Sequence, residues 1–388
     1  MIKVGSDFSG VGAFDQALRR LQIDYTTVFA CDMDLYARES YMANYGEPSY
    51  YPFDVYDRKI PTQSLDLYMT SPPCQAFSLA GRRKGEDDKR GVLFYNSHEF
   101  IVKNKPRYFI FENVKGLLSD AKGRTFQIWI DMLGGKSVNG NPVLFPREDA
   151  TPYHIYYKVL NAKHYGVPQN RERVFIIGIR DDADNHFHWP KPIPLTKRLK
   201  NVLESEVDEK FYLSDKSIEA LLVYNNRQLE NGNGFSAKFR DIDTVKTMDA
   251  LKVGGGGKDD LIKVKSATKQ GFEVAKEGDS INLNSETRRG RVGDKVAQTL
   301  DTACNQAVLM GKEANCGTRN LPLVSYDYKI RRLTPRECFR LMDFPDTFKF
   351  VCSDTQTYKQ AGNSIVVNVL AEILKKLKLT NKKDHGKI

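Results

Sequence analysis

Residues 2–20 read IKVGSDFSGVGAFDQALRR, and this stretch decides the class of fold. Its first part is a short strand-like run that leads into the glycine-containing turn FSGVG at 8–12. The residues that follow, DQALRR, have helix-forming character. A strand that ends in a turn of small residues and leads into a helix is the opening unit of an α/β sheet.

The same alternation recurs along the chain. Strand-like runs separated by helix-compatible stretches are TTVFACD (26–32), LDLYM (65–69), RYFIFEN (107–113), IYYKVL (155–160) and RVFIIGI (173–179). Several of them are apolar without two-residue alternation, as is typical of parallel strands covered on both faces. The sequence therefore predicts an α/β fold with a doubly wound, Rossmann-like sheet, and functional residues are expected in the loops after the strands.

Composition excludes several classes of protein. The 388 residues include 40% hydrophobic and 28% charged residues, which is ordinary for a globular protein. No apolar run approaches the roughly 18 residues of a membrane span, and the N-terminus lacks a signal-peptide core. The six cysteines form no C-x-x-C pair, which favours a reducing compartment and argues against structural zinc. We expect neither a membrane nor a metal as a partner.

The composition of the sequence changes after Trp189-Pro190. The next ten residues, KPIPLTKRLK, are rich in proline and basic residues, and four consecutive glycines stand at 254–257. Ordered patterning returns near residue 326. We therefore predict a first domain, a smaller inserted domain, and a return to the first domain that ends in a helix and a basic tail, over 1–189, 190–325 and 326–388.

Two helices are predicted in the last segment. RLTPRECFRL (332–341) places Thr334 as the N-cap, Pro335 at the first helical position and Glu337 as the partner in a capping box. Residues 365–378 then place apolar side chains on one stripe of an amphipathic helix. These side chains are Ile365, Val369, Ile373 and Leu377.

Three features of the first domain are suited to binding a nucleoside. The turn FSGVG allows backbone amides to approach a ligand, and Asp32 and Asp54, placed at the ends of strands, can accept hydrogen bonds from a ribose diol or an exocyclic amine. Each feature also has a purely structural reading, because glycine and aspartate are common in turns and at helix caps. The two readings stay open on these residues alone.

Reactive side chains follow other strands. In TSPPCQAFS (70–78), paired prolines hold Cys74 at the carboxyl end of a strand, where a nucleophile belongs, although most cysteines are simply buried. In FENV, Glu112 ends a very apolar strand, where partial burial favours its protonated form and lets it act as an acid. In QNRERV, strand alternation points Arg171 and Arg173 to one side, where they bind a carbonyl or phosphate or remain surface residues.

The combination of motifs is recognisable. The chain carries PCQ at 73–75, ENV at 112–114, Q-x-R-x-R at 169–173, RLTPRE at 332–337 and QAGNS at 360–364, with GRRKGEDDKRGVLF at 81–94. In this order and over residues 4–370 they resemble the cytosine-5 DNA methyltransferase family of bacterial and phage type. The resemblance implies a Rossmann-like methyltransferase sheet with a smaller target-recognition domain over 190–325.

The resemblance also implies catalytic roles. Cys74 matches the family's nucleophile, which adds to carbon 6 of cytosine and makes carbon 5 nucleophilic. Glu112 matches the glutamate that protonates or hydrogen-bonds ring nitrogen 3, and its neighbour Asn113 is expected to brace the loop. Arg173 matches the arginine directed at the cytosine carbonyl. Arg171 matches a neighbour that supports the catalytic loop or the cofactor side.

The methyl donor implied by the family is S-adenosyl-L-methionine, with no metal. Ser6 stands where the family usually has Asp, and Ala13 replaces a second consecutive Gly, which bears on cofactor affinity. The residues expected to bind the cofactor are Phe8, Gly10, Gly12, Asp32, Met33, Asp54, Pro72, Leu93 and Asn363.

The implied partner is double-stranded DNA, bound by a monomer in the bacterial cytosol at the nucleoid. A cytosine inside a duplex is inaccessible, so it has to be flipped out, and the loop 75–91 is suited to close over it. In the recognition domain, SETRRGRVG (285–293) offers clustered arginines for guanine edges or phosphates, or forms a solvated loop. The expected DNA-binding residues are Gln75, Ser78, Arg82, Arg83, Arg90, Arg288, Arg289 and Arg291.

The sequence therefore predicts a sequence-specific DNA (cytosine-5)-methyltransferase, either part of a restriction-modification pair or an orphan or phage enzyme. Two alternatives stay open. One is a tRNA cytosine-5 methyltransferase with the same cysteine motif, and the other is a catalytically silent DNA-binding relative.

Overall fold

The computed structural model describes most of the first half of the chain and selected parts of the second. The described residues are 1–73, 93–183, 186–212, 262–265, 272–275, 279–282, 292–300, 302, 306–310 and 329–379. Contacts divide the chain into two compact units. The large unit comprises 1–167, 172–194 and 342–388, and the small unit comprises 168–171 and 195–341. The role of 190–325 in target recognition stays a prediction.

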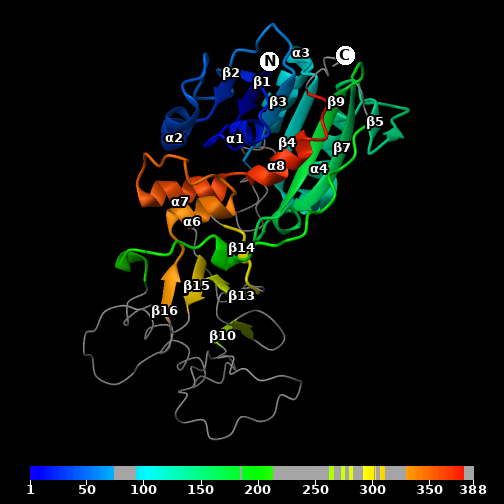
Figure 1. Cartoon of the computed structure of the whole chain (residues 1–388). Coiled ribbons are helices and arrows are strands. Elements are labelled where there is room, and N and C mark those ends of the chain that lie inside the picture. The colour runs from blue at the N-terminus through cyan, green and yellow to red at the C-terminus, as the bar shows by residue number, and fades with distance from the viewer. Residues whose placement is uncertain are drawn as a thin grey trace, which may run out of the picture. The chain divides into compact units, whose positions relative to one another are not determined.

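The large unit is built on one sheet with strand order β2-β1-β3-β4-β9-β7-β5-β6 (Figure 1). Its strands are β1 (Ile2–Asp7), β2 (Tyr25–Cys31), β3 (Leu67–Thr70), β4 (Tyr108–Val114), β5 (Ser137–Val138), β6 (Asn141–Pro142), β7 (Tyr153–Asn161) and β9 (Glu172–Arg180). Each strand-like run in the sequence is a strand of this sheet, which confirms the predicted α/β class.

The sheet is parallel only in part. β1 pairs in parallel with β2 and β3, and β3 with β4, whereas β9 runs antiparallel to both β4 and β7. The expectation of parallel pairing from apolar runs was therefore wrong for β9. The connection 162–171 between β7 and β9 is shorter than the crossover of about a dozen residues that parallel neighbours need, so the chain turns straight back.

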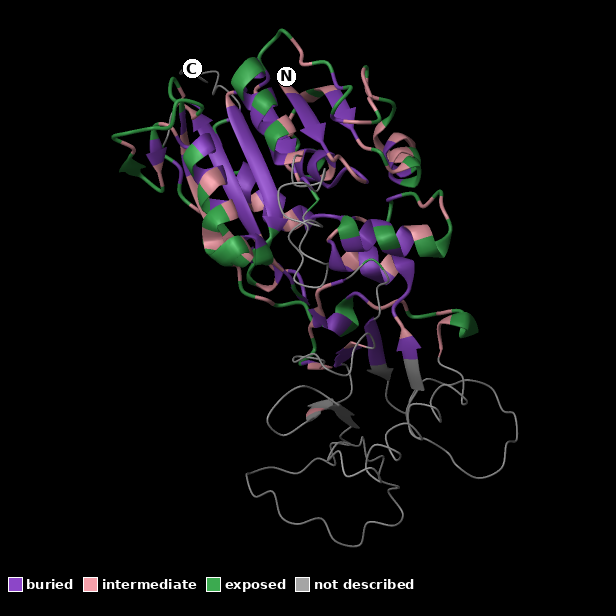
Figure 2. Cartoon of the chain, turned by 180° about the vertical axis from the view of Figure 1, so that it is seen from behind, coloured by how far each residue is buried: buried purple, intermediate pink, exposed green. Residues whose placement is uncertain are grey.

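Helices cover both faces of the sheet. α1 packs with α8 on one face and α3 with α4 on the other, as the opposite views of Figures 1 and 2 show. The strands between them are buried. The helices of the large unit are α1 (Ala13–Arg20), α2 (Leu35–Tyr45), α3 (Leu93–Asn104), α4 (Arg124–Leu133), α7 (Asp354–Asn363) and α8 (Val367–Leu374), with 3-10 turns η2 (Lys115–Gly123) and η3 (Ala162–His164).

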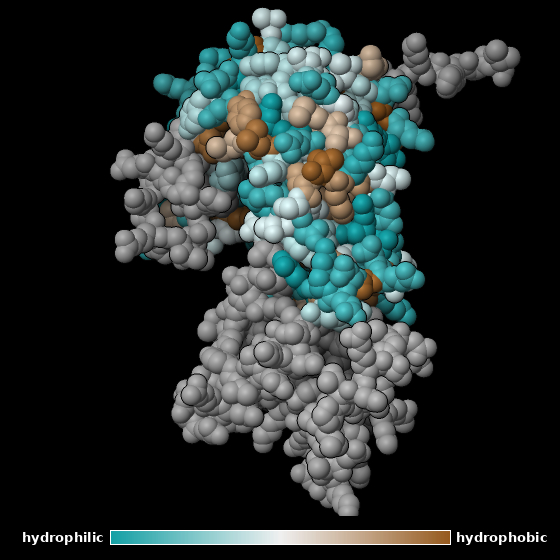
Figure 3. Space-filling model, turned by 90° about the vertical axis from the view of Figure 1, so that its left-hand side faces the viewer, coloured by the Kyte–Doolittle hydropathy of each residue, from teal (hydrophilic) through white to brown (hydrophobic). Residues whose placement is uncertain are grey.

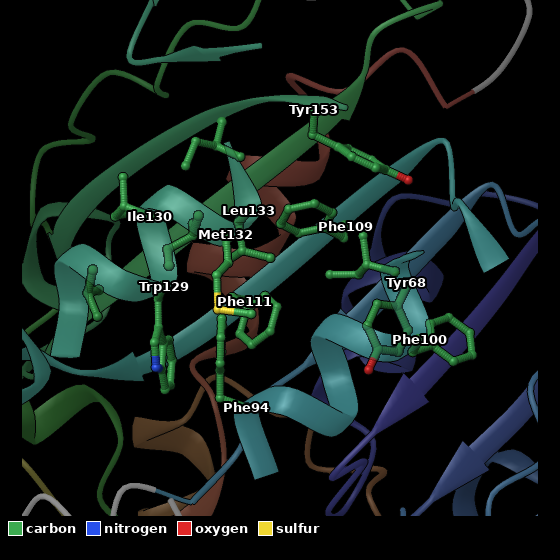
Figure 4. Close-up of a cluster of buried hydrophobic side chains, with 14 of the residues drawn as sticks. Tyr68, Phe94, Phe100, Phe109, Phe111, Trp129, Ile130, Met132, Leu133 and Tyr153 are labelled. Atoms are coloured by element: carbon green, nitrogen blue, oxygen red, sulfur yellow. The ribbon is translucent and has the colours of Figure 1, made fainter. Parts of the chain in front are cut away.

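An aromatic cluster fixes α3 and α4 on the sheet (Figure 4). Phe94 of α3 stacks on Trp129 of α4 with ring centroids 4.2 Å apart, and Tyr68 of β3 stacks on Phe100 of α3 at the same separation. Such ring pairs contribute about 1 kcal/mol each beyond the area that they bury. The start of α3, where Leu93 lies, is therefore held firmly against the strands.

The C-terminal helix prediction is confirmed, although the regular helix is shorter than the stripe. α8 covers Val367–Leu374, and Ile365 and Leu377 lie buried just outside its ends. α7, which ends at Asn363 of the QAGNS motif, was not expected from the sequence. Its residues DTQTYKQAGN carry no continuous apolar stripe, so periodicity does not reveal it.

The small unit contains an antiparallel sheet with strand order β13-β12-β15-β16. The strands and helices described in it are β8 (Gln169–Asn170), β10 (Ile262–Lys265), β11 (Phe272–Ala275), β12 (Ser280–Asn282), β13 (Val292–Gly293), β14 (Ala297–Gln298), β15 (Gln306–Met310), β16 (Lys329–Arg332), η4 (Leu199–Asn201), η5 (Glu209–Phe211) and α6 (Pro335–Leu341).

The capping box predicted for α6 is confirmed. The Thr334 amide donates to Glu337 Oε2 at 2.9 Å, and the Glu337 amide donates to Thr334 Oγ1 at 3.2 Å. Glu337 also forms a buried ion pair with Arg331, whose Nη2 lies 2.7 Å from Glu337 Oε1. The Glu337 carboxylate therefore both caps α6 and pairs with a buried guanidinium.

The surface of the large unit in Figure 3 is mainly hydrophilic with small apolar areas. Within the part of the chain that the structure describes, no helix is long and apolar enough to cross a membrane.

Candidate active site

The turn after β1 has the unusual backbone that its glycines predict. Phe8, Gly10 and Gly12 all have positive φ, at 57°, 53° and 81°. The Ser9 amide donates to the Cys31 carbonyl at 2.9 Å, which holds the turn beside the end of β2. A Cβ on Gly12 would lie 2.3 Å from the Tyr45 ring, whereas one on Gly10 would meet open space. Gly12 therefore serves close packing, and Gly10 leaves the approach to the turn unobstructed.

Asp32 lies directly after β2 and binds this turn. Its Oδ2 accepts from the Gly10 amide at 2.7 Å, and its Oδ1 accepts from the Asp34 amide at 2.9 Å. Burial raises the pKa of the Asp32 carboxyl, and the two amides act in the opposite direction. The structure thus brings Gly10 and Asp32 together, while the neighbouring Met33 is 74% exposed.

Asp54 is placed differently from the prediction. It lies in the connection between α2 and β3, so the expectation that it ends a strand was wrong. In the segment before Asp54, the Tyr50 carbonyl accepts a hydrogen bond from the Ala30 amide of β2. Pro52 has no amide hydrogen, so the segment cannot continue this pairing as a strand. Asp54 Oδ1 accepts from the Tyr56 amide at 3.0 Å, which is the turn role that was the alternative reading.

The loop after β3 is tied to the end of β4. The Asn113 side-chain amide donates to the Pro72 carbonyl at 3.1 Å, which is the bracing expected of the ENV motif. Pro72 is followed in the sequence by Pro73 and Cys74. Of the other residues expected to bind the cofactor, Leu93 begins α3 and Asn363 is the exposed last residue of α7.

Glu112 and Arg173 meet across antiparallel strands. Val114 is the register partner of Arg173, so Glu112, two residues earlier on the same face of β4, is its diagonal neighbour. Arg173 Nε lies 3.1 Å from Glu112 Oε1, and the two side chains are 16% and 9% exposed. A carboxyl group and a guanidinium are thus paired in a largely dehydrated place beside the loop that Asn113 holds.

Arg171 behaves differently from Arg173. β9 begins at Glu172, so the strand alternation that would point both arginines to one side does not reach Arg171. Arg171 belongs to the small unit, is 3% exposed, and donates from Nη1 to the Leu300 carbonyl at 3.0 Å. The structure therefore assigns it a buried contact within the small unit.

The nucleophile and the DNA-binding residues named from the sequence lie outside the described residues. They are Cys74, Gln75, Ser78, Arg82, Arg83, Arg90, Arg288, Arg289 and Arg291. Among the described residues, no group of three or more His, Cys, Asp or Glu side chains is placed to hold a metal ion.

Sequence reasoning missed a buried charged cluster in the large unit. Asp7, the last residue of β1, pairs with Arg58 at 2.8 Å and accepts a hydrogen bond from the Tyr68 hydroxyl at 2.6 Å. Asp7 follows directly after Ser6, which stands where the family usually has Asp, so the acidic side chain lies on the opposite face of the strand. The position of Asp7 at the end of an apolar strand indicates a buried charge that needs a partner. The sequence around Arg58 does not show that Arg58 is this partner.

Comparisons with known proteins agree with these motifs. The family described as C-5 cytosine-specific DNA methylase matches residues 2–379. The orphan methyltransferase M.SPRI of Bacillus phage SPR is 30% identical, with 97% of each chain covered. The type II methyltransferase M.HpaII of Haemophilus parainfluenzae is 30% identical over 95% of this chain and 87% of its own.

Solved structures share the fold. The Dnmt2 methyltransferase of S. pombe has a TM-score of 0.56 at 18% identity, covering 96% of this chain and 97% of its own. A putative DNA modification methyltransferase encoded within an E. coli prophage has the same TM-score at 20% identity, covering 97% and 98%. The sequence match extends over nearly the whole chain and includes enzymes of both orphan and type II kinds. The chain belongs to the C-5 cytosine-specific DNA methylase family and is a DNA (cytosine-5)-methyltransferase.

Proposed function

We propose that this methyltransferase modifies cytosine within a specific double-stranded DNA sequence, with S-adenosyl-L-methionine as methyl donor and Cys74 as nucleophile. The observation that carries the proposal is the Glu112–Arg173 pair beside the loop that Asn113 holds through Pro72. This arrangement places a carboxyl group, paired with a guanidinium, next in the chain to the residue that binds the first proline of the Pro-Pro-Cys segment.

In the proposed reaction, the thiolate of Cys74 adds to carbon 6 of a cytosine that has been flipped out of the duplex. The new carbon–sulfur bond pushes electron density toward ring nitrogen 3 and carbon 5. Glu112 protonates or hydrogen-bonds nitrogen 3, and Arg173 stabilises charge at the carbonyl, so both lower the barrier to addition. After carbon 5 gains the methyl group, a base removes its proton, and the Cys74 thiolate leaves.

The residues around the β1 turn fit an adenosine-containing cofactor. Gly10 offers open space next to a positive-φ backbone, and the Asp32 carboxylate stands at the end of the adjacent parallel strand. Acidic side chains in this position of an α/β sheet accept hydrogen bonds from ribose hydroxyls. The cofactor, when bound, supplies an electrophilic methyl group. Phe8, Met33, Asp54, Pro72, Leu93 and Asn363 are proposed to complete the binding site.

Recognition of the DNA sequence is assigned to 190–325, with Arg288, Arg289 and Arg291 contacting guanine edges or phosphates. Gln75, Ser78, Arg82, Arg83 and Arg90 would contact DNA around the flipped base, and Arg171 would support the catalytic side. The enzyme would act as a monomer on the bacterial nucleoid in the cytosol, as an orphan methylase or with a restriction enzyme.

The test is incubation of the purified protein with methyl-labelled cofactor and unmethylated genomic DNA, followed by bisulfite sequencing. Protection of cytosine within one short motif is the expected result. A parallel reaction with tRNA is the control for substrate class. Label in tRNA but not in DNA would replace the proposal by an RNA methyltransferase, and label in neither would indicate a silent DNA-binding relative.

A further inference from the structure

The most unusual feature outside the proposed catalytic groups is the ion pair between Asp7 and Arg58. Its side chains are 0% and 2% exposed, and their charged atoms lie 2.8 Å apart. The Tyr68 hydroxyl donates to the second oxygen of Asp7. Burial raises the pKa of Asp7, while Arg58 acts against this shift, so the charged form depends on its partner.

A buried ion pair is not by itself a stabilising feature. Removing two charges from water costs several kcal/mol per ion, and replacing such pairs by apolar residues of similar volume is often neutral or stabilising. The Arg58 guanidinium also lies over the Phe100 ring, 4.6 Å from its centroid, and donates a hydrogen bond to the Asn96 carbonyl at 3.3 Å. A cation held in this way fixes the relative positions of its neighbours.

Those neighbours are the segments that carry the proposed cofactor residues. Asp7 immediately precedes the turn 8–12, and Arg58 lies in the loop of Asp54. Asn96 lies in the first turns of α3, which Leu93 begins. Tyr68 belongs to β3, which leads to Pro72, and it stacks on Phe100 (Figure 4). One buried charged cluster therefore connects four segments that are far apart in the sequence.

We infer that Asp7 and Arg58, with Tyr68, are positioning residues for the cofactor site. Their proposed effect acts through the segments that they hold in place. Their geometry sets the spacing between the turn 8–12, the Asp54 loop and the start of α3 before any ligand arrives. Such preorganisation improves affinity because less ordering is needed on binding. The inference rests on the proposed function.

The test replaces the whole cluster by apolar side chains, as Asp7→Leu/Arg58→Met/Tyr68→Phe. Removing all partners together leaves no buried charge or hydroxyl of the cluster unpaired, so this variant is expected to fold. Its dissociation constant for S-adenosylmethionine, measured by calorimetry, is expected to rise about ten-fold or more because the segments are no longer preorganised. The KM for the cofactor should rise similarly, while kcat at saturating cofactor changes by less than about three-fold.

A measurement on the cofactor-free protein distinguishes a loss of positioning at the cofactor site from a general loss of stability. Amide hydrogen exchange at 9–12 and 54–58 is expected to accelerate in the cofactor-free variant, with exchange in β4 and β9 unchanged. Arg58→Lys keeps the charge but not the planar fork, so it should give an intermediate affinity. If Arg58→Lys fails to fold, the triple variant still decides the question.

The matched control is Asn104→Ala. Asn104 is also buried in the large unit and binds backbone groups of Pro61, Gln63 and Leu65, at the end of α3 away from Leu93. It should lower the melting temperature without changing cofactor affinity. A triple variant that folds and binds the cofactor like the wild type overturns the positioning role. If the wild type itself neither binds the cofactor nor methylates nucleic acid, the proposed function has failed instead.

Discussion

Arg173 Nε lies 3.1 Å from Glu112 Oε1, across the antiparallel pairing of β9 with β4. The proposed role of Glu112, to protonate or hydrogen-bond ring nitrogen 3 of cytosine, needs a carboxyl group that is held in place and that the base can still reach. The pair therefore has to be both close and slightly accessible, which matches side chains that are 16% and 9% exposed.

Glu112→Gln is expected to lower kcat by about two orders of magnitude or more, because general acid–base catalysis typically contributes this much. The amide keeps the shape and still hydrogen-bonds, but it cannot donate a proton to nitrogen 3. Single-turnover methylation at saturating DNA and cofactor measures the effect. Equal turnover of wild type and variant would show that Glu112 has no acid–base role.

Cys74→Ser should abolish methylation while leaving DNA binding largely intact, since a serine hydroxyl is far less nucleophilic than a thiolate. Label incorporation and a DNA gel-shift assay report the two properties separately. The matched control is Cys352→Ser, because Cys352 is a free thiol near the start of α7 with no proposed role. Substantial turnover by Cys74→Ser would assign the nucleophile elsewhere.

Gly12→Ala should destabilise the protein more than Gly123→Ala does. Both glycines have left-handed backbone angles and precede a helix, with φ/ψ of 81°/38° and 87°/−6°. Only at Gly12 would the new methyl group clash with a side chain, the Tyr45 ring at 2.3 Å, whereas at Gly123 its nearest neighbour is the Leu118 carbonyl at 3.5 Å. Backbone strain should cost each variant about 1 kcal/mol, and the clash should add about 1–3 kcal/mol for Gly12→Ala. Urea unfolding measures both, and equal losses would contradict this account.

The stability of the protein is expected to depend on pH through the buried side chain of Asp15. Burial raises the pKa of its carboxyl to about 6, although the hydroxyls of Tyr41, Tyr25 and Thr27 bind it. Because the folded-state pKa lies above the unfolded value, the stabilising contribution of the neutral acid is present below about pH 4 and is lost as pH rises through 6.

The corresponding variant is Asp15→Asn, which keeps a hydrogen-bond acceptor and does not titrate. Relative to the variant, the wild type should lose roughly 3 kcal/mol of unfolding free energy between pH 4 and pH 7. Denaturant titrations at several pH values across that range measure the difference. A constant difference would mean that Asp15 does not titrate in this window.

Much of the fold could be predicted from local patterns. The strand-like runs, the turn at 8–12 and the capping box of Thr334 and Glu337 depend on residues within a few positions of one another. Their physical causes, side-chain periodicity and satisfaction of helix-end amides, are therefore visible in the sequence. The motifs that identify the family are local for the same reason.

Other features depend on contacts with residues far away in the sequence, so local patterns could not predict them. The direction of β9 followed from a short connection to β7, and α7 lacks an apolar stripe, so neither could be read from its own residues. Arg171 and Arg173 look equivalent in the sequence, yet only Arg173 lies in β9 and meets Glu112.

The sequence by itself determined the α/β class and the cytosine-5 methyltransferase activity, because these reside in short runs and motifs. Only the tertiary structure decided which charges are paired. The free energy of a buried charge depends on what surrounds it, and for Asp7 that is Arg58 and Tyr68, contributed by other segments of the chain. The proposed positioning of the cofactor site therefore depends on contacts that only the folded protein makes.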